Sequence, residues 1–515
     1  MKFLFFNLSV RKILFLVFLL ILFHKITRHK TPAGAGSEWY VSSSQGDDSN
    51  DGASSEKPWK TLAKVSEQTL GPGAVIYLKR GDTWNEALIP KGNGNFNAQK
   101  WITVKPYGPE NSPKPAIDRA NASDANKDWA IKLVDNQAWR FEDLIVRNSK
   151  TGFVYLGTNE AVKKNGLIIE RCEFYNIEGL PNHAKTPEED QRAYWAMRGS
   201  SAIHISGFGY CKDGLPATNE NCLGEKGYYV GSYGPGLSHV RIADVKIKRT
   251  SGYGIWIWAG GFIGGKGENY HVRNASIEEA GIGGFEISFV KNALIENLQI
   301  KNAGQISSWS GTFGVDINYT QNVAFAGGEI TGTGGKVFTA GEGTGFNLNG
   351  PNVAYIVGMK IYENGGPAFA TQGNPQPEPT KVGIYDNIIY GNAWLSDDPK
   401  HGQEYPEFAI FFNPGNLETA VTARNNYIQM KPGKRHLICP VKDGQTELWK
   451  DDLNAQDYRL PSNFFCGNKD LLSNNLIAGN VECGQVAQAG SAAKPSEVIK
   501  PLTEIVNKID LKSGN

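Results

Sequence analysis

Apolar and polar residues alternate in short runs along most of this 515-residue chain, and corners rich in asparagine and glycine separate the runs. From about residue 138 onward one unit recurs, with copies such as FEDLIVRNSKTGFVYL, VRIADVKIKRTSGYGIWIW and VRNASIEEAGIGGFEIS. Successive copies are roughly 22 to 30 residues apart, which is typical of one turn of a β-solenoid. A strand that returns once per turn pairs with its own next copy about 4.8 Å away and builds a long parallel sheet. The pattern therefore predicts an all-β parallel β-helix, not a β-sandwich, whose neighbouring strands would be joined by hairpin turns.

Aligning the second strand of each unit predicts which side chains become neighbours. The aligned segments are AIHIS (202–206), GIWIW (254–258), GFEIS (284–288), GVDIN (314–318) and GFNLN (345–349). Every second residue of a strand faces the same side, so the apolar positions are expected to face the core. These positions are Ile203, Ile205, Ile255, Ile257, Phe285, Ile287, Val315, Ile317, Phe346 and Leu348.

The remaining residues of these strands point outward and form two columns. The first column contains His204, Trp256, Glu286, Asp316 and Asn347. The second contains Ser206, Trp258, Ser288, Asn318 and Asn349, and one more turn at each end adds Val154 with Leu156 and Ala370 with Gln372. Exposed tryptophan rings stack on apolar sugar faces, while amides and carboxylates bind sugar hydroxyls, so we expect a carbohydrate site on this face. The alternative is that the two tryptophans pack beneath a loop.

Long insertions interrupt the units on one edge of the predicted solenoid. They cover residues 178–200, 305–311 and 393–407, and another, 207–236, follows its strand. Long loops on a rigid scaffold commonly carry function, so we expect these insertions to form the walls of a groove over the two columns. Arg249, at a neighbouring corner, is expected to bind substrate together with His204, Trp256, Trp258, Asn318, Asn347 and Asn349.

Glu286 and Asp316 are the candidate catalytic residues. They lie on adjacent turns, so their Cα atoms should be about 5 Å apart, and two carboxylates that close should share a proton near neutrality. Such a pair supplies the general acid and the base or nucleophile of a glycosidase. A polar ladder without catalytic function or a calcium site beside Asn318 and Asn347 are the alternatives. The chemistry itself requires no cofactor.

The segment WYVSSSQGDDSNDGASSEKPWKTLAKV, followed by GPGAVIYLKRGDTW and WITVKPYG, resembles the N-terminal cap of the pectate-lyase-like superfamily. This resemblance implies a right-handed parallel β-helix and an activity among the glycoside hydrolases or polysaccharide lyases. Within the cap, Pro58 is expected at the start of a short helix, with Leu62 and Val65 plugging the open end of the solenoid. The acidic GDDSNDG segment (46–52) is interpreted as an Asx-rich turn, because an EF-hand loop would need glutamate where Pro58 stands.

Two other functions compete with a glycosidase. A polysaccharide lyase acting on a uronic-acid glycan needs a basic residue such as lysine or arginine, and the two columns contain none. A non-catalytic adhesin or envelope protein would use the same columns as a passive glycan-binding surface. The formal net charge of +1 gives no electrostatic reason to expect a nucleic acid partner. We therefore expect a monomer that acts on a polysaccharide or oligosaccharide.

The N-terminus predicts export. Arg11 and Lys12 precede the apolar run ILFLVFLLILF (13–23), and a small-residue cleavage motif follows at 33–35. Residues 1–36 are thus interpreted as a signal peptide or an uncleaved inner-membrane anchor, which makes the protein secreted, periplasmic or envelope-associated. Residues 37–137 are expected to form the cap and first coils, 138–485 the repeats, and 486–515 a C-terminal tail with a helix docked on the last turns.

The six cysteines fit an exported chain. Cys211 and Cys222 bracket a loop and are the expected disulfide, and one further pair is expected among Cys439, Cys466 and Cys483. Cys172 lies within a strand pattern and is expected to be a buried thiol.

Overall fold

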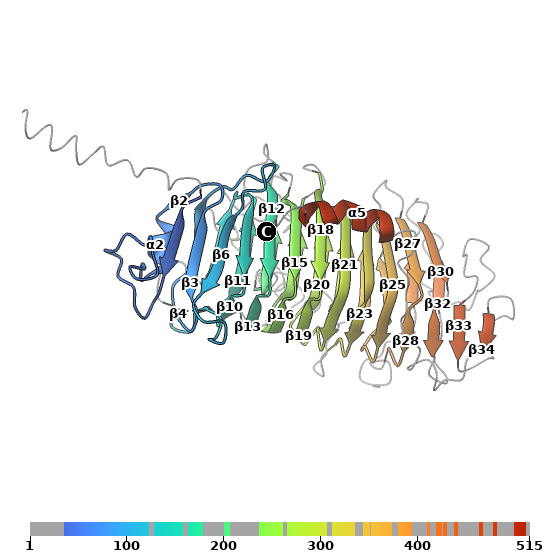
Figure 1. Ribbon diagram of the computed structural model, residues 1–515. Coiled ribbons are helices and arrows are strands. Elements are labelled where there is room, and N and C mark those ends of the chain that lie inside the picture. The colour runs from blue at the N-terminus through green and yellow to red at the C-terminus, as the bar shows by residue number, and fades with distance from the viewer. Residues whose placement is uncertain are drawn as a thin grey trace, which may run out of the picture.

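In the computed structural model the chain winds into a parallel β-helix, an elongated stack of coils with strands side by side along its length (Figure 1). The pairings between successive coils are parallel, as the alternation predicted. The structure describes residues 36–122, 128–157, 163–178, 200–206, 236–260, 265–305, 312–334, 343–350, 352–372, 380–393, 409–412, 419–424, 426–429, 437–440, 463–466, 477–480 and 499–510.

The described coils have three strand-forming sides, where the sequence pattern predicted two strands per coil. In the unit VRIADVKIKRTSGYGIWIW, a strand ends at Ala243, the next begins at Lys246, and the third begins at Tyr253. The first corner is made by Asp244, whose φ of 55° turns the chain within what looked like one continuous strand. Asparagine and aspartate tolerate this left-handed conformation better than most residues, so the corner leaves only a weak signal in the hydrophobic pattern.

The strands form two main sheets. The eight-stranded sheet contains one strand from each of eight successive coils: β8 (Trp129–Val134), β11 (Thr151–Leu156), β14 (Ile203–Ser206), β17 (Tyr253–Trp258), β20 (Gly283–Ser288), β22 (Phe313–Asn318), β24 (Thr344–Asn349) and β26 (Phe369–Gln372). The 22-stranded sheet wraps around the other two sides, because the long strands β21 (Val290–Lys301), β23 (Gln321–Thr331) and β25 (Val353–Tyr362) run through both.

The remaining strands of the 22-stranded sheet divide between these two sides. One side contains β1 (Glu38–Val41), β3 (Val75–Lys79), β6 (Ile102–Tyr107), β9 (Trp139–Glu142), β12 (Asn165–Glu170), β15 (Ser238–Ala243), β18 (Gly267–Arg273), β27 (Thr380–Tyr385) and β30 (Thr419–Arg424). The other contains β4 (Thr83–Trp84), β7 (Ala116–Asp118), β10 (Ile145–Arg147), β13 (Glu173–Ile177), β16 (Lys246–Thr250), β19 (Ser276–Ala280), β28 (Ile388–Tyr390), β31 (Tyr427–Gln429), β33 (Asn463–Cys466) and β34 (Ile477–Asn480). Two short sheets pair β2 (Thr69–Leu70) with β5 (Lys91–Gly92) and β29 (Ala409–Phe412) with β32 (Leu437–Pro440).

The inward residues form one continuous apolar core along the coils. All ten predicted core positions of the aligned strands are buried within it. Buried apolar surface is the main favourable term in folding, and here it is supplied in equal layers by each coil. Cys172 is buried with a free thiol, as predicted. Cys211 and Cys222 lie outside the described residues.

Helix α2 (Leu62–Ser66) lies at the N-terminal end of the stack and buries Leu62 and Val65, as the sequence predicted. It begins after Thr61, which corrects the predicted start at Pro58. Asp48 accepts the Thr61 hydroxyl at 2.7 Å and thereby orients the residue that caps the helix. Within the same acidic segment Asp47 accepts the backbone N–H of Ser49 at 2.8 Å, so the segment is an Asx turn as predicted.

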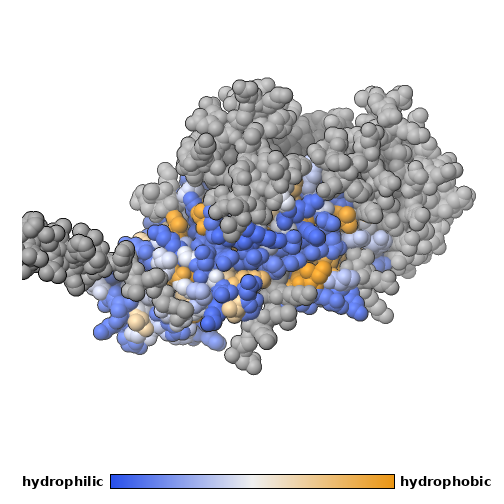
Figure 2. All heavy atoms as spheres, turned by 90° about the horizontal axis from the view of Figure 1, so that it is seen from above, coloured by the Kyte–Doolittle hydropathy of each residue, from blue (hydrophilic) through white to orange (hydrophobic). Residues whose placement is uncertain are grey.

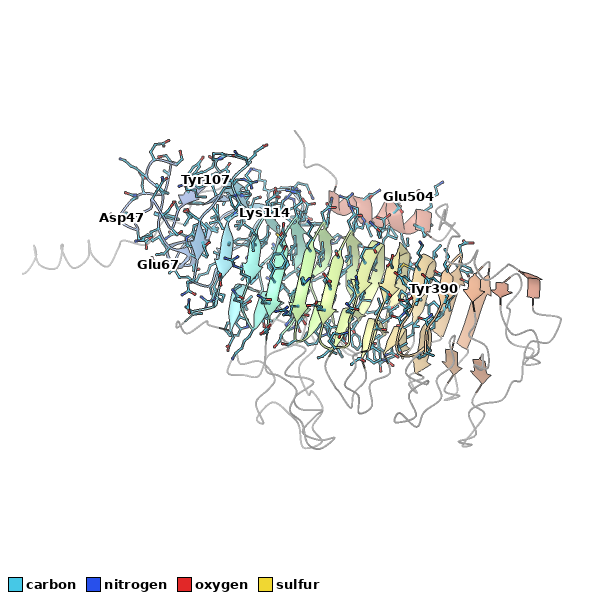
Figure 3. All side chains as sticks on the ribbon, turned by 90° about the horizontal axis from the view of Figure 1, so that it is seen from below. Asp47, Glu67, Tyr107, Lys114, Tyr390 and Glu504 are labelled. Atoms are coloured by element: carbon cyan, nitrogen blue, oxygen red, sulfur yellow. The ribbon has the colours of Figure 1, made fainter. Side chains whose placement is uncertain are left out.

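Helix α5 (Ile499–Asp510) packs on the middle of the solenoid, which corrects the prediction that it docks on the last turns. Its residues Leu502 and Val506 are fully buried, together with Ile499, against Leu294, Ala324 and Val357 of β21, β23 and β25. These three strand residues point away from the main core and would otherwise be an apolar patch on the outer face. Glu504 lies on α5 (Figure 3) and is exposed.

Seen from above, the described surface is largely hydrophilic, with scattered hydrophobic patches (Figure 2). None of the described helices is long and apolar enough to cross a membrane. Residues 1–35 lie outside the described part of the chain.

Candidate active site

The outer face of the eight-stranded sheet carries the two predicted columns in the predicted register. His204 pairs with Trp256, Trp256 with Glu286, Glu286 with Asp316, and Asp316 with Asn347. The second column is in register as well, from Ser206 through Trp258, Ser288 and Asn318 to Asn349. The extensions at both ends also hold, because Val154 pairs with His204 and Ala370 with Asn347. Residues up to 52 positions apart in the sequence therefore become direct neighbours.

The centre of the first column is buried, which corrects the prediction of an exposed surface. Glu286 and Asn347 are fully buried, Asp316 is 1% exposed and Trp256 is 6% exposed. Trp256 stacks on His204 with ring centroids 4.2 Å apart and packs with Tyr253 and Ile282. Period-two alternation shows that a side chain leaves the core, but it does not show what lies over that side chain. Trp258, in the second column, is partly exposed.

Asp316 accepts hydrogen bonds from the asparagines of the next coil. Its Oδ1 accepts the amide groups of Asn347 at 2.9 Å and Asn349 at 3.1 Å. The Tyr253 hydroxyl lies 3.5 Å from its Oδ2. An ionised carboxylate has acceptor sites for all three donors, so this environment suits Asp316 as an anion.

Glu286 has a different environment. Its Oε1 accepts the hydroxyl of Ser288 at 2.9 Å, and that hydroxyl accepts the Asn318 amide at 3.0 Å. The two acids therefore receive different donor sets although they are adjacent in the ladder. Pairs of titratable groups held in unlike environments are a common arrangement for acid and base catalysis.

Several buried polar atoms of this face have no hydrogen-bond partner among the described residues: His204 Nε2, Asn347 Oδ1, Asn349 Oδ1 and Thr344 Oγ1. Buried polar groups are normally paired, so a cluster of such atoms beside two acids suits a polar ligand. Burial lowers the pKa of His204 to about 3, so its imidazole is neutral near pH 7.

Arg249 is not brought to this face. It lies at the end of β16, in the 22-stranded sheet, where its side chain is 57% exposed and its Nε is 3.6 Å from Glu279 Oε2. A φ of 62° places it on a corner, as the sequence indicated. Substrate binding by Arg249 stays a prediction. The insertions 179–199, 207–235, 306–311 and 394–408, from which the groove walls were expected, lie outside the described residues.

Three aromatic residues of this region were not singled out by the alignment: Tyr253, Phe289 and Tyr319. Each stands just outside the aligned five-residue segments, at the first residue of β17 or directly after β20 and β22. Their sequence positions could have identified two of them, because Phe289 and Tyr319 each come directly after a residue of the second column on consecutive coils.

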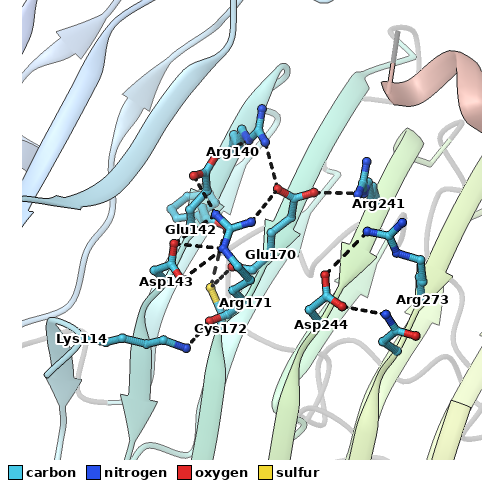
Figure 4. Close-up of polar contacts among 12 residues, drawn as sticks. Lys114, Arg140, Glu142, Asp143, Glu170, Arg171, Cys172, Arg241, Asp244 and Arg273 are labelled. Atoms are coloured by element: carbon cyan, nitrogen blue, oxygen red, sulfur yellow. Dashed lines mark hydrogen bonds and ion pairs between the residues drawn. The ribbon is translucent and has the colours of Figure 1, made fainter. Parts of the chain in front are cut away.

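The densest group of charged side chains lies elsewhere, on β9, β12 and β15 of the 22-stranded sheet (Figure 4). Glu170 contacts Arg140 at 2.9 Å and Arg241 at 3.0 Å, and Arg171 contacts Glu142 at 2.9 Å and Asp143 at 3.0 Å. The three arginines face three carboxylates, so the charges of this network balance one another. We interpret it as a network that stabilises the fold. In the described ranges no group of three or more histidine, cysteine, aspartate or glutamate side chains could hold a metal ion.

A family model described as a right handed beta helix region matches residues 260–434, in agreement with the fold and with its predicted hand. The chain is thus a right-handed parallel β-helix protein. Lacto-N-biosidase from Bifidobacterium longum subsp. longum is 38% identical over 89 residues, which are 17% of this chain and 6% of that protein. The chain therefore matches only a small part of the length of this curated relative.

Two solved structures have similar architectures. GH136 lacto-N-biosidase from Eubacterium ramulus has a TM-score of 0.49 and 15% identity, over 83% of this chain and 72% of that one. Alginate lyase from Paenibacillus sp. str. FPU-7 has a TM-score of 0.40 and 11% identity, over 64% and 93% of the two chains.

Proposed function

We propose that this protein is an exported glycoside hydrolase that cleaves an oligosaccharide or polysaccharide at the outer face of the eight-stranded sheet. The observation that carries the proposal is the adjacent, buried pair of Glu286 and Asp316, each with its own set of donors. The sequence match to a lacto-N-biosidase supports a hydrolase and makes a lacto-N-biose unit the first substrate to test.

The different donor sets suggest a division of labour between the two acids. Asp316, with three donors, serves as the anion that attacks the anomeric carbon or activates a water molecule. Glu286, which accepts the Ser288 hydroxyl, donates its proton to the departing glycosidic oxygen. The proton of Glu286 passes to the glycosidic oxygen while the C–O bond breaks, and the bonding electrons stay on that oxygen. A water molecule then supplies the hydroxyl group of the new reducing end and the proton that restores Glu286.

The columns favour a hydrolase over a lyase. A lyase removes the proton next to a uronic carboxylate with a basic side chain, and the columns contain neither lysine nor arginine from His204 to Asn349. The nearest lysine of the first column, Lys132, lies two coils before His204. The apolar segment 13–23 supports export, and a glycan substrate outside the cytoplasm agrees with it.

The test is incubation of the protein with 4-nitrophenyl lacto-N-bioside, polygalacturonate, alginate and xylan. The proposal predicts released nitrophenol or new reducing ends without an unsaturated, ultraviolet-absorbing sugar. An unsaturated product identifies a lyase, and binding without cleavage identifies a passive glycan-binding protein; either result contradicts the proposal.

A further inference from the structure

Two corners beside the acids contain residues that are unusual for their backbone conformation. Phe289 and Tyr319 both have a φ of 54°, directly after β20 and β22. Among the described residues they are the only Phe, Tyr or Trp residues with positive φ. A bulky residue in the left-handed region costs about 1–2 kcal/mol, which asparagine and glycine largely avoid.

The next corners along the same coils show the ordinary solution. Asn292 has a φ of 58° and Asn322 has a φ of 59°, and the Asn322 amide donates to Asn292 at 2.9 Å. Three residues after Phe289 and Tyr319, asparagine thus adopts the left-handed backbone conformation at little cost. Its side chain also forms a hydrogen bond to the asparagine of the neighbouring coil. An aromatic pair contributes about 0.5–1.5 kcal/mol beyond the burial of its rings, so packing offsets much of the strain at the buried Phe289, and the partly exposed Tyr319 recovers less. Strain retained at such positions is commonly associated with function.

The two rings belong to a continuous aromatic row, formed by Trp258, Phe289 and Tyr319. The Trp258 and Phe289 centroids are 5.4 Å apart, and Phe289 stacks on Tyr319 at 4.9 Å with an interplanar angle of 12°. Gly350 occupies the equivalent corner on the following coil, where a Cβ atom would lie 2.5 Å from Cε1 of Tyr319. The row therefore ends at the backbone of Gly350. Phe289 and Tyr319 lie on the same two coils as Glu286 and Asp316.

The row is also connected to the acids. Tyr319 follows Asn318, whose amide donates to Ser288, and Ser288 in turn donates to Glu286. Trp258 and Tyr319 are partly exposed, whereas Phe289 is 2% exposed. Only the two outer members thus present surface, and Phe289 supports them from between.

We propose that Trp258 and Tyr319, supported by Phe289, form a binding surface for the apolar face of a pyranose ring next to the bond that Glu286 and Asp316 cleave. This inference rests on the proposed function. The ligand chemistry is that of a neutral hexose or N-acetylhexosamine ring, whose axial C–H groups pack on an aromatic face while its hydroxyls reach the neighbouring amides.

The test is the double variant Phe289→Asn/Tyr319→Asn, assayed on the panel substrate that the wild-type protein cleaves fastest. Asparagine suits both corners, but the loss of the buried Phe289 ring offsets the relief of strain, so the kinetics are measured well below the thermal midpoint of the variant. KM should increase about tenfold or more, the loss expected for removal of one good stacking surface, while kcat changes less. The conservative variant Tyr319→Trp should keep a KM close to the wild-type value.

The matched control is Glu363→Asn, which relieves the same strain at a corner with a φ of 52° that carries no residue of the aromatic row. It should leave KM unchanged. An unchanged KM in the double variant, whether its thermal midpoint is retained or lowered, overturns the inference and leaves the proposed function intact. A wild-type protein that neither cleaves nor binds any of the four panel substrates overturns the proposed function, and this inference with it.

Discussion

The hydroxyl group of Tyr253 lies 3.5 Å from Oδ2 of Asp316, although β20 separates their strands β17 and β22. The ring passes over Gly283, the partner of Tyr253 on the intervening strand, where a Cβ atom would lie 2.5 Å from the tyrosine Cε1. A glycine at this position is therefore needed for a contact across two coils.

Tyr253→Phe should lower kcat by about tenfold, since a hydrogen bond to a charged group contributes about 1.5–3 kcal/mol and this one is long. Gly283→Ala should have a similar effect because the added methyl group displaces the ring. Steady-state kinetics on the cleaved panel substrate measures both. Tyr362→Phe is the control, because Tyr362 donates to Glu329 in the 22-stranded sheet, and it should retain full activity. Equal kcat values for Tyr253→Phe and the wild type would show that this tyrosine does not assist Asp316.

Glu286→Gln and Asp316→Asn should each lower kcat by about 100- to 10,000-fold while keeping much of the glycan affinity, because the amides preserve shape but transfer no proton. Turnover and calorimetric binding to the same substrate measure the two properties. Asp118→Asn is a suitable control, since Asp118 also accepts hydrogen bonds from an asparagine and an arginine but lies on β7. A parallel loss of affinity and no turnover in the wild type would instead describe a passive binding protein.

Protein stability should fall as the pH is lowered through the range set by His204. The unfolded chain takes up a proton near pH 6.5, whereas burial lowers the pKa of His204 to about 3 in the folded state. Between these values the unfolded state binds more protons, so the free energy of unfolding decreases with falling pH, by up to about 1.4 kcal/mol per pH unit.

The His204→Gln variant should therefore lose less stability than the wild type between pH 7 and pH 5. Thermal midpoints of both proteins at the two pH values provide the measurement, and the pH 7 pair corrects for the lost stacking on Trp256. If acidification lowers both midpoints equally, His204 is accessible to protons in the folded protein.

Leu502→Ala should release helix α5 from the solenoid. Truncating a fully buried leucine costs about 2–5 kcal/mol, and in a helix that docks through three residues this cost falls on the docking step. Hydrogen exchange of residues 499–510 should accelerate by at least about tenfold. Lys500→Ala, at an exposed position of the same helix, should leave exchange unchanged. Protection that persists in Leu502→Ala would mean that the apolar contact is not what holds α5.

The register of the eight-stranded sheet was predictable because it depends on two local properties. Alternation fixes the face of each side chain, and an interval of 30 or 31 residues between these strands fixes its neighbours, so Trp256, Glu286, Asp316 and Asn347 could be aligned from the sequence. The same reasoning could not show that Glu286 and Trp256 are buried, because burial depends on what lies above the sheet.

Other features escaped prediction for related reasons. Asp244 makes a corner inside an apparently continuous strand, so the strand that follows it, such as β16, was missed. The contact between Tyr253 and Asp316 crosses a coil, which an alignment of nearest neighbours does not consider. The amphipathic pattern of α5 predicted the helix but not which of the stacked coils it contacts.

The position of α5 also has a consequence for the order of events during synthesis. The strands that carry Leu294, Ala324 and Val357 are synthesised long before Leu502 and Val506. Until helix α5 has been made, these three residues form an uncovered apolar stripe on the outer face of the coils. A nascent or truncated chain lacking residues 499–510 would display that stripe to chaperones or to other copies of itself. Helix α5 can therefore cover that stripe only after the residues between Val357 and Ile499 have been synthesised.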